Sequence, residues 1–219
     1  MEKEELEIAN QPGVSIIVCA HNQAENLRHY LHALCSQKYP EYEVIVVNDA
    51  SEDDTQIVLE QYTQLFRNLR ITFVPLPSTI NLPSSNSKHQ RSALLPLTLA
   101  AKAAKYDYLL LTEPDCRPET PNWISGMIRG FENPDTELVL GPSRFFSGEL
   151  LFNILRLFIH PLPISNLAIR KDVFFESLRH SEHSSFRKVR VKNPDAVVWK
   201  LPFPSLSDWR LYRAAQVHF

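Results

Sequence analysis

Glycine is scarce in this chain, which has only five glycines among 219 residues. No GxGxxG segment follows an apolar run, and no GxxxxGK segment precedes a helical pattern. Both motifs hold phosphate groups by pointing backbone amides at them from a glycine-rich turn at the start of a helix. A phosphate-bearing ligand would therefore need another source of positive charge in this protein.

Net charge and cysteine are low as well. The 23 basic and 25 acidic residues nearly cancel, so no overall field favours nonspecific binding of nucleic acid. The three cysteines, Cys19, Cys35 and Cys116, have no CxxC spacing, which argues against a disulfide framework and against a structural zinc site. We therefore expect a protein of the reducing cytoplasm with no nucleic-acid partner.

Long apolar runs are missing too. The most apolar stretch, residues 150–160, contains Asn153 and Arg156 and is shorter than the ~20 apolar residues that a membrane span needs. The acidic start of the chain lacks the basic and then apolar pattern of a secretory signal. We expect a cytoplasmic protein that is either free of the membrane or peripheral at its inner face. The residues that would contact lipid, or else pack in the core, are Leu150, Leu151, Ile154, Leu157 and Phe158.

Buried strands and helices alternate along the first half of the chain. Apolar runs without clean alternation are typical of strands buried on both faces of a parallel sheet. Four such runs are residues 14–20, 42–47, 70–75 and 106–112. Helical spacing covers residues 23–37, the segment after a cap at 51–54, and residues 91–104. This order predicts an open, mostly parallel α/β sheet that binds ligands at the carboxyl ends of its strands.

Further elements follow from the same patterns. The helix after residue 54 is predicted to turn Val58, Tyr62, Leu65 and Phe66 inward. Residues 75–88, rich in proline, serine and asparagine, predict a long loop. Beyond residue 118, helices are expected at 123–131, 150–160, 171–178 and 208–219, and strands at 137–141 and 165–169.

Two acids, Glu113 and Asp115, come directly after the fourth predicted strand. They are separated by Pro114, which favours an extended backbone before it, and two acids two residues apart on an extended backbone face the same way. Such a pair suits a hard cation that bridges to substrate phosphates. The alternative is an acidic loop in solvent, but the lack of a glycine-rich phosphate cradle favours the metal.

Asp49 ends the second predicted strand, and Ala20, His21 and Asn22 end the first. A carboxylate at a strand end can accept a hydrogen bond from the N–H of a nucleobase. The alternative is that Asn48, Asp49 and Ser51 only build a turn and cap a helix, and both interpretations stay open at this point.

Residues 14–26 (VSIIVCAHNQAEN), 37–55 (QKYPEYEVIVVNDASEDDT) and 111–118 (LTEPDCRP) resemble, in order and spacing, the three opening blocks of the family 2 glycosyltransferases. Residues 166–171 (NLAIRK) and 193–199 (NPDAVVW) are similar to later segments of that family. The resemblance covers residues 13–145 best.

The resemblance implies an α/β GT-A (nucleotide-diphospho-sugar transferase) fold, with a mostly parallel sheet flanked by helices. It implies a single domain over 1–219, with a donor half at 13–118 and a less typical acceptor half at 119–219. The implied activity is transfer of a sugar, with inversion, from a nucleoside-diphosphate donor that we expect to be uridine-based. The acceptor would be a glycan or lipid-linked hydroxyl, as in cell-envelope polysaccharide synthesis.

The resemblance also implies roles for particular residues. Asp49 matches the acid that reads the nucleobase, and Glu113-Pro-Asp115 matches the DxD motif, with Asp115 as the direct ligand of Mn²⁺ or Mg²⁺ and Glu113 assisting it. The residues expected to bind the donor are Ala20, His21, Asn22, Glu25, Asp49, Lys88, Glu113, Arg210 and Arg213.

The second half departs from the family pattern. The acidic pair that usually holds the general base is absent, which leaves Glu182 or Glu176, and we assign the catalytic role to Glu182. A positioned carboxylate that removes a proton from the attacking hydroxyl contributes ~10²–10⁴-fold to the rate. The alternative for Glu182 is a solvated side chain, and the corresponding alternative for the protein is a nucleotide-sugar-binding pseudoenzyme. Arg210-Leu-Tyr-Arg213 resembles a family motif but is followed by alanine where tryptophan is usual.

Overall fold

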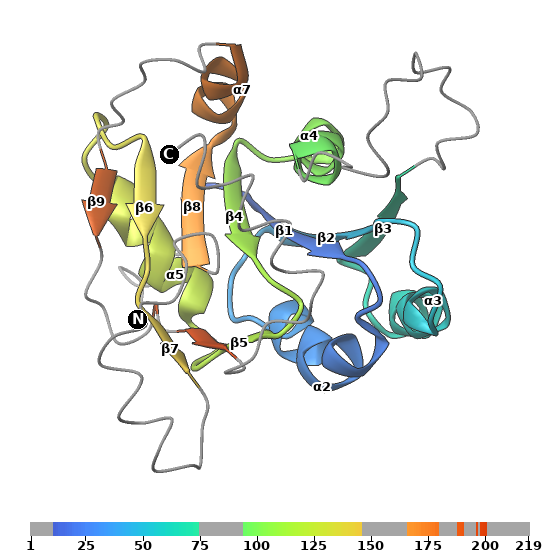
Figure 1. Ribbon diagram of the computed structural model, residues 1–219. Coiled ribbons are helices and arrows are strands. Elements are labelled where there is room, and N and C mark those ends of the chain that lie inside the picture. The colour runs from blue at the N-terminus through green and yellow to red at the C-terminus, as the bar shows by residue number, and fades with distance from the viewer. Residues whose placement is uncertain are drawn as a thin grey trace.

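The computed structural model describes residues 11–74, 94–145, 166–179, 188–190, 196 and 198–200. Within them, a seven-stranded sheet has the strand order β3-β2-β1-β4-β8-β6-β9 (Figure 1). Its strands, in chain order, are β1 (Val14–Ala20), β2 (Tyr42–Asn48), β3 (Leu69–Phe73), β4 (Tyr108–Thr112), β6 (Leu138–Leu140), β8 (Leu167–Arg170) and β9 (Lys188–Arg190).

Most neighbouring strands run parallel, as the sequence predicted. β1 pairs parallel with both β2 and β4, β2 with β3, and β6 with β9. β8 is the exception, because it runs antiparallel to β4 on one side and to β6 on the other. The expected α/β architecture with a mostly parallel sheet is therefore confirmed.

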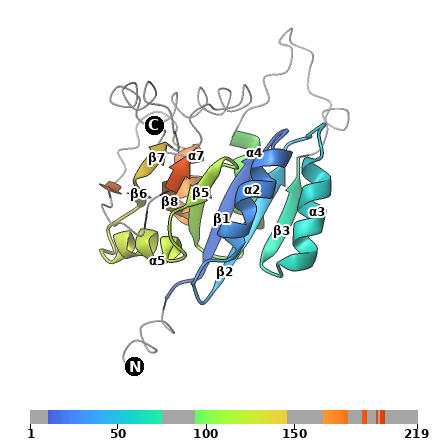
Figure 2. The ribbon, with the colours of Figure 1, turned by 90° about the horizontal axis from the view of Figure 1, so that it is seen from below.

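Helices cover both faces of this sheet. The helices are α2 (Ala24–Cys35), α3 (Thr55–Leu65), α4 (Leu94–Ala103), α5 (Trp123–Ile128), which continues into a 3₁₀ turn at Arg129–Phe131, and α7 (Lys171–Arg179). Helices α2, α3 and α5 lie on one face, toward the viewer in Figure 2, and α4 and α7 lie on the other.

Alternating residues of the central strands fill the two cores. In β1, Ile16 and Val18 belong to the core beneath α2, α3 and α5, whereas Ile17 belongs to the core beneath α4 and α7. Since side chains of a strand point alternately to opposite faces, a strand covered on both faces must be apolar throughout. This is why the central strands have unbroken apolar runs rather than alternating patterns.

A second, three-stranded sheet was not predicted. It contains β5 (Cys116–Pro118), β7 (Ser143–Phe145) and β10 (Val198–Lys200), in the order β5-β10-β7. β10 pairs antiparallel with β5 and parallel with β7. Its strands are three residues long and come from distant segments, so none of them gives a periodic signal in the sequence.

A buried acid organises the end of the large sheet where β1 and β2 begin. The carboxylate of Glu43 accepts hydrogen bonds from Ser15 Oγ (2.7 Å), the Lys105 amide (2.6 Å) and Arg70 Nη1 (2.9 Å). Burial alone would raise the pKa of Glu43, but the three hydrogen bonds and the Arg70 charge outweigh burial, so the pKa lies below its ordinary value. The ionised carboxylate therefore stabilises the start of the sheet.

Helix α3 differs from the prediction at Leu65, which was expected to face the core. Val58 is buried and Tyr62 and Phe66 pack partly against the core, but Leu65 is 73% exposed. The helix ends at Leu65 and Phe66 has an extended backbone, so Leu65 is the last residue of the helix and its side chain lies in solvent. The predicted loop at 75–88 and the predicted helices at 150–160 and 208–219 lie outside the described residues.

Candidate functional site

Three strand ends meet at the point where the strand order reverses. β1 lies between β2 and β4, with Ala20 opposite Asn48 and Val18 opposite Thr112. Because all three strands run parallel, the loops that follow Ala20, Asn48 and Thr112 leave the same edge of the sheet. In open α/β sheets, ligands bind outside the carboxyl ends of the strands at such a reversal.

A tight turn follows β4 and brings the two predicted acids together. The amide of Cys116 donates to the carbonyl of Glu113 (3.0 Å), so residues 113–116 form a turn with Pro114 in its second position, which proline favours. The extended backbone expected here was wrong, but the acids still converge. One carboxylate oxygen each of Glu113 and Asp115 and the Cys116 sulfur lie within 4.8 Å of one another.

The acid turn is buried. Glu113 and Asp115 are only 6% and 4% exposed, and Cys116 is fully buried. The Cys116 thiol lies 3.5 Å from Asp115 Oδ1 and is a weak donor to it. Two carboxylates held close together in a buried position repel each other unless a cation or a proton lies between them. The turn therefore has the charge and the oxygen atoms that a divalent cation requires.

The loop after β1 is bonded to the loop after β2. The amide of Asn22 donates to Ser51 Oγ (3.0 Å), and the Asn22 side-chain oxygen accepts from the Glu52 amide (2.7 Å). The Ser51 amide in turn donates to Asn48 Oδ1 (3.1 Å). Asn22 (φ 54°) and Ala50 (φ 48°) both have left-handed backbones, so each loop reverses sharply where it meets the other.

His21 and Asp49 contact each other across these loops. His21 Nδ1 lies 2.7 Å from the carbonyl oxygen of Asp49. A carbonyl can only accept, so Nδ1 carries the proton in this contact. Nearby in β1, burial and, to a smaller extent, the negative charge of Asp49 raise the pKa of the Cys19 thiol to about 12, so Cys19 stays protonated. Asp49 thus presents a carboxylate next to an uncharged strand end.

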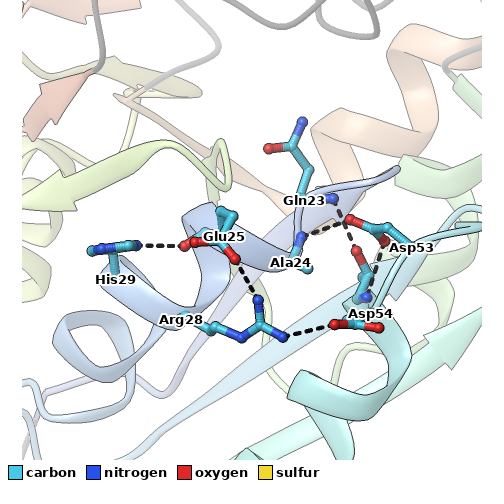
Figure 3. A network of polar contacts seen from close by, with 8 residues as sticks. Gln23, Ala24, Glu25, Arg28, His29, Asp53 and Asp54 are labelled. Atoms are coloured by element: carbon cyan, nitrogen blue, oxygen red, sulfur yellow. Dashed lines mark hydrogen bonds and ion pairs between the residues drawn. The ribbon is translucent and has the colours of Figure 1, made fainter.

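The start of α2 is held by the loop that precedes α3 (Figure 3). The Ala24 amide donates to Asp53 Oδ2 (3.1 Å), and the Gln23 amide donates to Thr55 Oγ1 (2.9 Å). These side chains satisfy amides at the first turn of α2 that have no partner within the helix. The predicted cap of α3 differs, because Asp53 Oδ1 accepts from the Thr55 amide and Ser51 bonds the other loop instead.

The exposed side of the same region has a short chain of charges, also visible in Figure 3. Arg28 contacts the carboxylates of Glu25 in its own helix and Asp54 at the start of α3. Both acids are more than half exposed, and exposed ion pairs of this kind contribute ~0–1 kcal/mol to stability. Glu25 therefore lies on the exposed face of α2, paired with Arg28.

All but one of the predicted site residues fall into two groups, and the remaining one, Glu25, lies on the exposed face of α2. The structure brings one group together at the carboxyl edge of β1, β2 and β4: Ala20, His21, Asn22, Asp49, Glu113 and Asp115. The other group lies outside the described residues: Lys88, Glu182, Arg210 and Arg213. Glu176, the other candidate base, is exposed on α7.

The residues that hold these loops in place were not predicted from the sequence. Ser51, Asp53 and Thr55 support the first loop rather than merely starting a helix. Asn166 has a comparable role elsewhere in the fold: it is 1% exposed, and its side chain bonds three separate segments. Local sequence has no signal for these roles, because each partner is more than 20 residues away.

This fold and its acid-bearing edge define an α/β protein of the GT-A type. Residues 15–82 match the sequence model of the family described as Glycosyl transferase family 2. The chain is similar to the glycosyltransferase AglE of Haloferax volcanii (42% identity over 62 residues, 27% of this chain and 20% of the relative). It is also similar to the chondroitin synthase of Escherichia coli (28% identity, 61% and 18%) and the hyaluronan synthase of Pasteurella multocida (30% identity, 61% and 12%). The expected resemblance to the family 2 glycosyltransferases is therefore confirmed. The chain spans about a fifth or less of the length of these three relatives.

Solved structures agree with the fold. A mannosyltransferase from Pyrobaculum calidifontis, in complex with GDP-Man and Mn²⁺, aligns over 96% of this chain and 64% of its own, with a TM-score of 0.64 and 17% identity. TarS 1–349 of S. aureus aligns over 94% and 64%, with a TM-score of 0.62 and 17% identity. At these identities the likeness establishes the GT-A fold alone. Among the described residues, no helix has the length and apolar character needed to cross a bilayer.

Proposed function

We propose that this protein is a metal-dependent glycosyltransferase that moves a sugar, with inversion, from a nucleoside-diphosphate donor to a glycan or lipid-linked hydroxyl. The observation that carries the proposal is the buried turn at Glu113 and Asp115, which lies where the sheet presents its ligand site. The chain has five glycines and no glycine-rich phosphate cradle, so these acids are the feature through which a diphosphate can be held.

The acids fit a hard divalent cation such as Mn²⁺ or Mg²⁺. They offer carboxylate oxygens within 4.8 Å of each other, and such cations prefer oxygen ligands. When bound, the cation would neutralise charge on the donor diphosphate and on the leaving nucleoside diphosphate. Asp115 would bind the cation directly and Glu113 would assist. A Mn²⁺ ion in the complex of the Pyrobaculum mannosyltransferase supports this assignment.

The nucleoside would lie against the loops after β1 and β2. Asp49 is positioned to accept a hydrogen bond from a base N–H, and the His21 bond to its carbonyl holds the Asp49 backbone. Ala20 and Asn22 would contact the donor from the loop after β1, and Glu25 would contact the donor from the first turn of α2. Solved relatives of this fold bind GDP-Man and UDP-GlcNAc, and we expect a uridine-based donor here.

The acceptor side would lie in residues 119–219, with the donor side in residues 13–118. Glu182 would remove the proton from the attacking hydroxyl, and Lys88, Arg210 and Arg213 would contact the donor. Polysaccharide synthases among the relatives support a glycan acceptor in cell-envelope polysaccharide synthesis, at the cytoplasmic face of the membrane.

The test is the affinity for a nucleotide sugar, measured by calorimetry with Mn²⁺ and with EDTA. UDP-GlcNAc, UDP-glucose and GDP-mannose form the first panel. Asp115→Asn should abolish the Mn²⁺-dependent part of the affinity, and Glu113→Gln should reduce it by less. Glu119→Gln is the matched control, because Glu119 is an exposed acid four residues beyond Asp115. Equal wild-type affinities in Mn²⁺ and EDTA would contradict the metal-dependent function.

Turnover separates the enzyme from a binding protein. Release of UDP or GDP, with and without polysaccharide or lipid-linked acceptors, measures donor hydrolysis and transfer. Metal-dependent binding without turnover on any acceptor would support the pseudoenzyme alternative. Loss of turnover with intact donor affinity in Glu182→Gln would support Glu182 as the base.

A further inference from the structure

Asn166 is a buried polar side chain that joins three separate segments of the chain. Its Oδ1 accepts a hydrogen bond from the indole N–H of Trp123 in α5 (3.0 Å). Its Nδ2 donates to the carbonyl of Pro142 (2.9 Å) and to the carbonyl of Ala196 (2.6 Å). The two carbonyls occupy both hydrogens of the amide, so only an NH₂ group satisfies this position.

The two carbonyls lie where two strands of the small sheet begin. Pro142 directly precedes β7, and Ala196 lies two residues before β10. β7 and β10 are parallel neighbours, so a single amide holds both of them at corresponding ends. The contact is tight, because a Cβ placed on Gly141 would lie 2.3 Å from Asn166 Nδ2. The position of the Asn166 amide is therefore closely determined.

The small sheet leads directly to the acid turn. β10 pairs antiparallel with β5, whose first residue is Cys116, and the Cys116 amide closes the turn by bonding to Glu113. Asn166 also lies at this edge of the large sheet, since the next residue, Leu167, pairs with Leu111 near the end of β4. The Asn166 side chain thus connects with the acid turn through β10 and β5.

We propose that Asn166 is a positioning residue that sets the small sheet, and through it the acid turn, against the end of β4. This role requires no contact between Asn166 and the donor. Its side-chain hydrogen bonds hold β7 and β10, β10 holds β5, and β5 holds the turn of Glu113 and Asp115 in place. The consequence for donor binding rests on the proposed function, whereas the structural part of the inference does not.

Three variants test this role. Asn166→Asp keeps the acceptor for Trp123 but turns an oxygen toward the carbonyls of Pro142 and Ala196, so those two bonds cannot both form. Gly141→Ala places a methyl against the amide, and also against Met127 Sδ, without adding charge. Trp123→Phe is the matched control, since it removes the third hydrogen bond from an equally buried side chain and leaves both carbonyl contacts intact.

Hydrogen exchange of peptides that cover residues 116–118 and 198–200, without ligand, is the first measurement. Exchange there should rise in Asn166→Asp and Gly141→Ala, while β1 and β2 stay protected, and should change little in Trp123→Phe. Unchanged exchange in both test variants, or an equal rise in the control, would overturn the inference. The hydrogen-exchange measurement uses no donor, so it tests the role of Asn166 even if the proposed function is wrong.

Affinity for UDP-GlcNAc with Mn²⁺ is the second measurement, at a temperature where circular dichroism shows each variant folded. Residues that orient metal-binding groups typically change affinity by roughly 10–100-fold. We expect a loss of that size in Asn166→Asp and a small change in Trp123→Phe. If wild type binds and Asn166→Asp binds equally well, Asn166 does not position the site. If wild type shows no Mn²⁺-dependent binding, the proposed function fails and hydrogen exchange alone decides the role of Asn166.

Discussion

Ala50 has a left-handed backbone that costs stability, and replacing it with glycine should recover part of that cost. Its φ is 48°, and the left-handed region costs a residue with a Cβ about 1–2 kcal/mol. The conformation is imposed from both sides, because the carbonyl of Asp49 accepts from His21 and the amide of Ser51 donates to Asn48. None of these bonds involves the Ala50 side chain.

The size of the effect follows from three contributions. Glycine removes the strain but adds about 0.5–1 kcal/mol of backbone entropy to the unfolded chain. The Ala50 methyl is half-buried, so its loss costs less than the ~0.8 kcal/mol of a fully buried CH₂ group. We expect Ala50→Gly to raise the free energy of unfolding by about 0.5 kcal/mol. In a chain of this size that corresponds to roughly 1–2 °C in Tm.

Asn22→Gly is the matched comparison, because Asn22 has a similar φ of 54°. Asparagine tolerates the left-handed region better than alanine, and its side-chain oxygen also accepts a hydrogen bond from the Glu52 amide (2.7 Å). Glycine would lose that bond and gain unfolded-state entropy, so Asn22→Gly should lower the free energy of unfolding by about 1–2 kcal/mol. Urea unfolding followed by circular dichroism measures both variants. The reasoning is refuted if Ala50→Gly is less stable than Asn22→Gly, or if it loses more than about 1 kcal/mol, since strain relief would then be absent.

Three further predictions concern the rest of the fold. Folding lowers the pKa of Glu43 below its ordinary value of 4.5. The ionised carboxylate therefore contributes to stability above pH 4.5, and this contribution is lost as the pH falls through the pKa of the folded protein. Urea unfolding between pH 7 and pH 3 should show a smaller loss of stability in Glu43→Gln than in wild type. Leu59→Ala should cost about 2–5 kcal/mol and Leu65→Ala less than about 0.5 kcal/mol, because Leu59 is fully buried and Leu65 is 73% exposed; equal losses in urea unfolding would contradict the observed face of α3. Burial raises the pKa of Cys19 and of Cys35 to about 12, so neither thiol should react with iodoacetamide at pH 8 until the protein is unfolded. Mass spectrometry detects the labelled thiols, and rapid labelling of the folded protein would contradict this prediction.

Much of the fold was readable from local sequence. The apolar runs at 14–20 and 42–47 became β1 and β2, and the pattern at 23–37 became α2. These strands lie between two layers of helices, so their central side chains, residues 16–20 and 44–47, are apolar on both faces for the same reason. The sequence also predicted that the strand ends at Ala20 and Asp49 lie next to each other, because parallel strands that alternate with helices finish at the same edge of a sheet.

Other features came only from the tertiary structure. Glu113 and Asp115 were expected to converge through an extended backbone, whereas a turn closed by Cys116 brings them together. The antiparallel β8 and the three-stranded sheet were not predicted, and neither was the exposed end of α3 at Leu65.

The physical reason is the range of the interactions. Periodicity in the sequence reports which side of an element is buried, because burial is shared by neighbours along the chain. The bonds of Asn166 to Trp123, Pro142 and Ala196 join residues 24 to 43 positions apart, and short strands such as β5 and β10 are stable only through such partners. Sequence alone therefore determined the α/β class, the resemblance to the family and the sheet edge where the candidate acids lie, whereas long-range pairing decided how the acids and the small sheet are held there.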